Sequence, residues 1–130
     1  MKTIVIVSAL SLLTAQAFAG EQVDINYMNM YKKCISENGG ASNGSVEACA
    51  DNISEKVKKE INKEYIRIHK ALLKENKLHS DQFDDAQKTW LTYRNMHCEL
   101  ATWYVGSPQH SYCPMILNIE RLRELKEFRF

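Results

Sequence analysis

The sequence predicts an all-α fold, a small disulfide-stapled helical bundle of three main helices plus a short N-terminal helix. Three observations predict it. Apolar residues recur every three or four positions along four segments, and no segment alternates with a period of two over a useful length. Polar stretches containing glycine separate these segments. Four cysteines lie in two equally spaced pairs, as in a small domain tied by disulfides.

The N-terminus has the pattern of a cleaved secretion signal. Lys2 precedes a short apolar run over residues 4–13, and Ala17-Phe18-Ala19 is a small-x-small cleavage motif. The run is shorter than the roughly 20 apolar residues that span a bilayer. We therefore expect residues 1–19 to be removed and residues 20–130 to form a single helical domain, periplasmic or secreted, with no membrane anchor.

The charge balance argues against two classes of partner. The whole chain has 17 basic and 16 acidic residues, and Lys2 is the only charged residue in the expected signal. The mature protein is therefore formally neutral. A nucleic-acid-binding domain would carry a basic excess, and so would a polybasic membrane-binding protein.

The first two expected helices precede the middle of the chain. Residues 23–36 form one, because Ile25, Met28, Tyr31 and Ile35 share a face, and Asn38-Gly39-Gly40 ends it. The second and longest runs from Ser45, its expected N-cap, to Asn76. Interleaved lysines and glutamates cover its outer faces, which favours a solvated surface over an interaction patch.

The last two expected helices follow the same logic. Residues 80–104 form the third, with Ser80 or Asp81 as the cap and acidic residues in its first turn. The fourth begins at Ser107-Pro108, a serine N-cap followed by proline at the first helical position. Its expected buried stripe comprises Met115, Ile116, Ile119, Leu122 and Leu125.

The cysteines predict two disulfides. An even count in an exported chain indicates paired cysteines, with three possible pairings. Cys34 and Cys49 are 15 residues apart, as are Cys98 and Cys113, and each pair brackets a turn-rich stretch. We therefore expect Cys34–Cys49 and Cys98–Cys113, each stabilising the fold by about 3 kcal/mol in the chain-entropy model. A zinc site is disfavoured because no pair has CxxC spacing.

No catalytic or metal-binding pattern is evident, so we expect a protein that is not an enzyme and has no cofactor or metal. The four histidines show neither HxxxH nor HExxH spacing, and no GxSxG or phosphate-binding loop occurs. A cysteine nucleophile activated by His97 is disfavoured because Cys98 is expected to be oxidised. The acidic residues fall mainly on charged helix faces, and none stands out as a pair for glycoside hydrolysis.

One polar and aromatic cluster is unusual. Gln87, Trp90, Arg94 and Cys98 follow at spacings of three, four and four, so they share one side of a helix. An exposed binding spot is one interpretation, since tryptophan and arginine are enriched at hot spots. A structural role is favoured, with Trp90 in the core and the Arg94 stem lying on it. Arg121 and Glu124 are expected to join the same network.

These residues also carry a resemblance to a known family. The chain reads Cys34 and Cys49, then Ile61-Asn62-x-x-Tyr65, then Ala86-Gln87-x-x-Trp90-x-x-Tyr93-Arg94-x-x-x-Cys98, then Gly106-Ser107, Cys113 and Arg121-x-x-Glu124-Leu125. In this order the motifs resemble the LprI-type lysozyme inhibitor domain, over about residues 34–125. Asn95 stands where an acidic residue is common in that family. The resemblance implies a helical exported protein, and lysozyme inhibition in some members.

We therefore expect a noncatalytic protein that binds a protein partner such as a lysozyme or other cell-wall hydrolase. The alternative is a periplasmic immunity or accessory protein that binds a secreted toxin. An inhibitor of an acid-lined glycan cleft would insert a loop rich in hydrogen-bond donors. The disulfide-anchored loop at residues 106–112 is the preferred candidate, although a mere connection between helices is an equal alternative. Its polar contacts would be Ser107, Gln109, His110 and Tyr112.

Overall fold

The computed structural model describes residues 14–130, with side chains from Asn26 onward. This part of the chain contains four helices and no strand, which confirms the all-α expectation. Residues 1–13, most of the expected secretion signal, lie outside the described residues. The helices are α1 (Thr14–Glu37), α2 (Asn43–Glu75), α3 (Lys77–Tyr104) and α4 (Gln109–Lys126). The N-terminal helix begins at Thr14, nine positions before the expected start at Val23.

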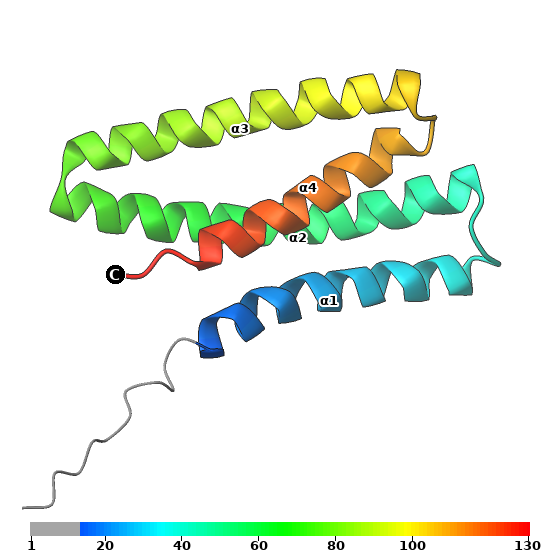
Figure 1. Ribbon diagram of the computed structural model, residues 1–130, viewed down its shortest axis with the longest axis horizontal. Coiled ribbons are helices and arrows are strands. Elements are labelled where there is room, and N and C mark those ends of the chain that lie inside the picture. The colour runs from blue at the N-terminus through cyan, green and yellow to red at the C-terminus, as the bar shows by residue number, and fades with distance from the viewer. Residues whose placement is uncertain (1–13) are drawn as a thin grey trace, which may run out of the picture.

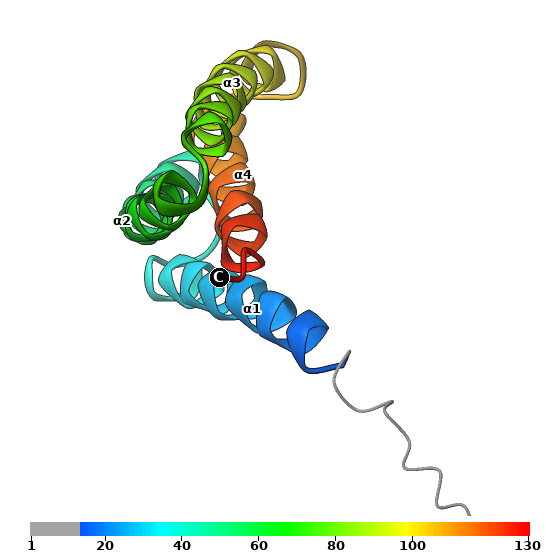
Figure 2. The same cartoon turned by 90° about the vertical axis from the view of Figure 1, so that its left-hand side faces the viewer.

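Helix α4 is the centre of the molecule. It contacts α1, α2 and α3, whereas α1 and α3 do not contact each other within the described residues. Successive helices run antiparallel, and α4 crosses α2 between the two outer helices (Figure 1). The view along the bundle shows α1 and α3 on opposite sides of α4, with α2 beside it (Figure 2). The shortest helix therefore provides the contact surface that holds the other three together.

The core forms around the stripe predicted for α4. Met115, Leu122 and Leu125 are fully buried, and Ile119 nearly so. The long stripe of α2 faces them, while one aromatic residue from each outer helix completes the cluster: Val57, Ile61 and Ile68 from α2, Tyr31 from α1 and Phe83 from α3. Burial of this apolar surface is the main stabilising contribution to the fold.

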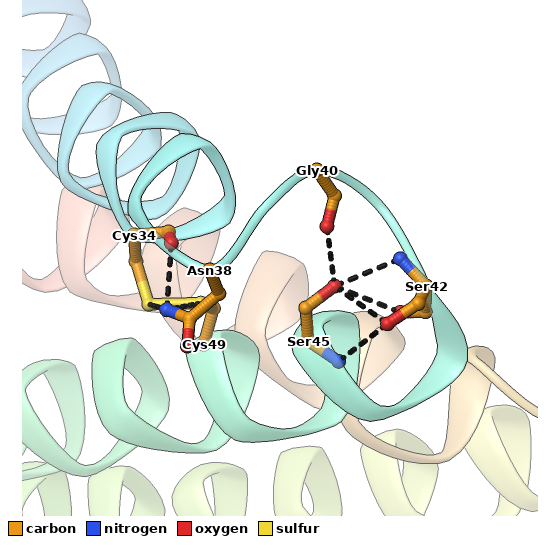
Figure 3. Close-up of a disulfide and its surroundings, with 6 residues drawn as sticks. All are labelled: Cys34, Asn38, Gly40, Ser42, Ser45 and Cys49. Carbon is orange, nitrogen blue, oxygen red and sulfur yellow. Dashed lines mark hydrogen bonds between the residues drawn. A yellow bond between two sulfur atoms is a disulfide. The ribbon is translucent and has the colours of Figure 1, made fainter.

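The N-cap of α2 lies three residues before the expected position. Ser42, not Ser45, is the N-cap of α2; Ser45 is the third helical residue of a capping box and donates from its hydroxyl to the Gly40 carbonyl at 2.7 Å (Figure 3). The expected glycine stop is present, because Gly39 and Gly40 have φ angles of 80° and 104°. Gly40 donates to the Ile35 carbonyl at 3.0 Å, as in a Schellman motif.

The two other expected caps are also wrong. Asn76 alone separates α2 from α3: its N–H donates to the Leu72 carbonyl at 2.7 Å, and its side chain accepts from the Leu78 N–H at 2.9 Å. Neither Ser80 nor Asp81 is needed at a helix end that Asn76 already caps. Helix α4 has Pro108 at its N-cap position and no side-chain cap, so Ser107 does not cap it.

Both disulfides have the predicted pairing. Cys34–Cys49 joins α1 to α2, and Cys98–Cys113 joins α3 to α4, with Cα–Cα distances of 5.8 and 5.5 Å. The Asn38 side-chain amide approaches the first disulfide and donates to the Cys34 carbonyl at 2.8 Å (Figure 3). Each disulfide thus fixes the crossing of two consecutive helices close to the turn that connects them.

Candidate functional site

The polar and aromatic motif residues form a network between α3 and α4. The guanidinium carbons of Arg94 and Arg121 lie 5.3 and 5.6 Å from the centre of the half-buried Trp90 ring, within cation–π range. Arg121 donates twice to the Gln87 side-chain oxygen, at 3.0 and 2.9 Å, and once to Glu124 at 2.8 Å. Each of these residues therefore has a partner within the bundle.

Arg94 extends this network to α2. It donates at 2.8 Å to Asn118, which is 1% exposed and in turn donates to the buried Ser54 hydroxyl at 2.7 Å. Burial lowers the pKa of the Arg94 guanidinium. Asn95 stands at the position expected to carry an acidic residue, and its side-chain oxygen accepts two hydrogen bonds from Arg94, at 3.1 and 2.8 Å. The geometry thus supports the structural interpretation of Trp90 and Arg94.

An open groove lies between α2 and α3 beside this network. Its volume is about 370 Å³, and Asn62 and Tyr65 from α2 face Gln87, Trp90 and Arg94 from α3 across it. The two central motifs, from α2 and from α3, therefore meet in one place. Tyr93 does not line the groove: it is 53% exposed and stacks on His97, with ring centroids 5.4 Å apart.

A second polar cluster, centred on Asp84, was not predicted from the sequence. The Tyr65 hydroxyl donates to Asp84 at 2.8 Å, and the same carboxylate oxygen lies 2.9 Å from His69 Nδ1. The Tyr65 hydrogen bond lowers the pKa of Asp84 and raises that of Tyr65. The sequence signal that could have identified this cluster is the spacing of four residues between Tyr65 and His69 and between Ser80 and Asp84.

This cluster does not have the geometry of a catalytic triad. The Ser80 hydroxyl lies 3.2 Å from His69 Nδ1, the same nitrogen that Asp84 approaches. A serine–histidine–aspartate relay uses the two different ring nitrogens. Ser80 is also fully buried, so no substrate can reach it. The cluster therefore holds the two helices together beside their connecting turn.

The four candidate loop residues do not share one surface. Residues 109–112 belong to α4, so the connection is shorter than expected. Ser107 lies in the turn, and its hydroxyl accepts from Asn43 at 3.3 Å. Gln109 and His110 line two different cavities. Tyr112 packs on the core, with its ring centroid 5.5 Å from that of Tyr31.

The same region exposes aromatic surface that the sequence interpretation did not select. We call residues 95–114 the α3–α4 corner. Trp103, Tyr104 and Val105 are 77%, 85% and 75% exposed at the end of α3. Cavities of about 420 and 650 Å³ adjoin them, the first lined by His110 and the second by Gln109. Two of the four expected contact residues thus border an aromatic protrusion held by the Cys98–Cys113 disulfide.

Two classes of site are absent from the described residues. Among the side chains that the structure describes, those of residues 26–130, no group of three or more histidines, cysteines, aspartates or glutamates is placed to hold a metal ion. Within residues 14–130, no helix has both the length and the apolar character needed to cross a membrane.

Comparison with known proteins yields one match. No curated protein and no solved structure matches the chain. The family model of the lysozyme inhibitor LprI matches residues 34–125, which include both disulfides and every motif residue of the α3–α4 network. Because this match covers well over half of the sequence, the chain belongs to the LprI lysozyme inhibitor family.

Proposed function

We propose that this protein is an exported, noncatalytic inhibitor that binds a lysozyme-type cell-wall hydrolase through its α3–α4 corner. Membership of the LprI family supports a lysozyme-inhibitor-like binding protein. The choice of surface rests on one observation: Trp103, Tyr104 and Val105 are strongly exposed on a segment that a disulfide holds in place.

Exposed clusters of large apolar side chains on a soluble domain mark interaction surfaces more often than isolated ones do. Tryptophan and tyrosine contribute the largest binding energies at protein interfaces. The Cys98–Cys113 disulfide fixes the end of α3 against the start of α4, so little conformational entropy would be lost when this corner enters a cleft. The motif side chains Trp90, Arg94 and Arg121, by contrast, are already engaged within the bundle.

Export is part of the proposal. Two disulfides are the pattern of an oxidising compartment, and the N-terminal residues have a secretion-signal pattern. Cleavage after Ala19 would remove only the beginning of α1. The remaining part of that helix would keep Tyr31 in the core and Cys34 in its disulfide.

A cell-wall lysis assay tests the proposal. Mature protein, residues 20–130, is titrated against several purified lysozymes while the turbidity of a cell-wall suspension is followed. We expect slower lysis with at least one of them. The double variant Trp103→Ala/Tyr104→Ala should weaken inhibition by about 30-fold, the equivalent of a 2 kcal/mol hot spot. Phe130→Ala removes an exposed aromatic ring at the opposite end of the bundle and should inhibit like the parent.

Two outcomes contradict the proposal in different ways. If no lysozyme is slowed at micromolar excess of the protein, the inhibitor function is wrong, and a secreted toxin becomes the partner to test. If the corner variant inhibits as well as Phe130→Ala, inhibition stands but the assigned surface is wrong.

A further inference from the structure

We infer that the cavity between Trp103, Glu99 and His110 receives one cationic side chain, an arginine or lysine, from the protein partner. This inference rests on the proposed function and names the chemistry of the partner at the same corner. The cavity is distinct from the groove that contains the family-like motif residues.

The cavity lies on one side of the corner and has a volume of about 420 Å³. Asn95, Glu99 and Trp103 are four residues apart on α3 and therefore lie one above the other on the same face. Its complete lining combines these with other groups from the end of α3 and the start of α4: Asn95, Cys98, Glu99, Thr102, Trp103, His110 and Pro114. Its volume is in the range of small-ligand sites, and its wall carries both a carboxylate and an indole ring.

Two acceptor groups of this cavity, on Glu99 and Thr102, are available to a cation. Glu99 is exposed and makes no ion pair or hydrogen bond with any residue in the described part of the chain. The Thr102 hydroxyl donates to the Cys98 carbonyl at 2.8 Å, which leaves its oxygen lone pairs to accept a bond. An ammonium or guanidinium group could therefore bond to Glu99 and Thr102 at the same time.

Trp103 supplies the second element of a cation site. The other tryptophan of the protein, Trp90, already has two guanidinium groups of this chain within 6 Å of its ring, those of Arg94 and Arg121. Among the described residues, no arginine or lysine lies over Trp103, and that ring is 77% exposed. Indole is the best aromatic partner for a cation, and an adjacent carboxylate adds direct charge attraction.

Charge complementarity selects a cation over an apolar occupant. A partner that covers the aromatic corner also removes water from Glu99, because Glu99 and Trp103 line one cavity. Burying a carboxylate without a partner is strongly unfavourable, whereas a bonded cation offsets that desolvation. The partner surface that fits this corner must therefore present a basic side chain next to its apolar contact.

The test uses the two indole N–H signals of the mature protein in nuclear magnetic resonance spectra. Trp103→Phe assigns the signal of Trp103, and Trp90 serves as the internal reference. The probe is N-acetyl-arginine amide at millimolar concentration, at neutral pH, with the neutral citrulline counterpart as control. We expect the arginine probe to shift the Trp103 signal and the citrulline probe to leave it in place. Glu99→Gln should weaken the arginine response at least tenfold, whereas Glu120→Gln, which removes an exposed acid outside this cavity, should not.

Three results would overturn the inference: equal shifts by the arginine and citrulline probes, an unchanged response in Glu99→Gln, or a shift caused by a trisaccharide of N-acetylglucosamine but not by arginine. The last would identify a glycan site instead. The lysis assay separates this inference from the proposed function. If the protein slows no lysozyme yet binds the arginine probe in a Glu99-dependent way, the proposed function fails and the cation site stands. If the Glu99→Gln variant folds and inhibits like the parent, the inference fails and the proposed function stands.

Discussion

Replacing each tryptophan by alanine should separate the two roles assigned to helix α3. Trp90 and Trp103 have the same chemistry and lie on the same helix, but their surroundings differ. Trp90 packs on the core between two arginines, whereas Trp103 is 77% exposed. Trp90→Ala should therefore lower stability and Trp103→Ala should lower binding.

The expected loss for Trp90→Ala follows from its partial burial. Truncating a fully buried tryptophan costs about 3–5 kcal/mol. Because this ring is only half-buried, we expect about half of that, roughly 2 kcal/mol. Loss of the contacts with Arg94 and Arg121 adds about 0.5 kcal/mol each, for a total near 3 kcal/mol. For a domain of about 100 residues, this lowers the melting temperature by about 12 °C.

Thermal melts and the lysis assay are run on the same two variants. Trp103→Ala should change the free energy of unfolding by less than about 0.5 kcal/mol, as surface substitutions usually do. Below its melting temperature, Trp90→Ala should still inhibit. The reasoning is refuted if Trp90→Ala melts like the parent and loses the partner, or if both variants are equally destabilised.

Two further predictions concern covalent structure and pH. Peptide mapping without reduction should recover Cys34–Cys49 and Cys98–Cys113 in a chain that begins at Gly20, and any crossed linkage would contradict this pairing. The double variant Cys98→Ala/Cys113→Ala should lower the free energy of unfolding, measured with urea, by about 3 kcal/mol. The folded-state pKa of Asp84 lies below its ordinary value of 3.8, so its contribution to stability is present above that pH and is lost as the pH falls through the folded-state pKa. Urea midpoints from pH 7 to pH 3 should therefore fall less steeply for Asp84→Asn than for the parent, and parallel curves would show that Asp84 does not contribute.

Patterns within single segments were sufficient for the helices, their buried stripes and the disulfides. The stripe of α4 is visible because residues three or four apart share a helix face, whatever the helix packs against. The cysteine pairing follows from short loops, since each pair closes a turn between consecutive helices. The helix caps were less predictable, because several serines stand near each helix end and the turn geometry selects among them.

The tertiary structure decided which polar residues meet and which aromatic residues remain exposed. Gln87 and Arg121 are 34 positions apart and bond only because α3 and α4 pack together. Tyr65 and Asp84 meet because α2 and α3 pack together beside their connecting turn. The sequence alone determined that this chain forms a disulfide-bonded helical domain, because periodicity and loop closure are local properties. The aromatic corner and its cavity depend on how α4 crosses α3, and contacts distant in the sequence set that crossing.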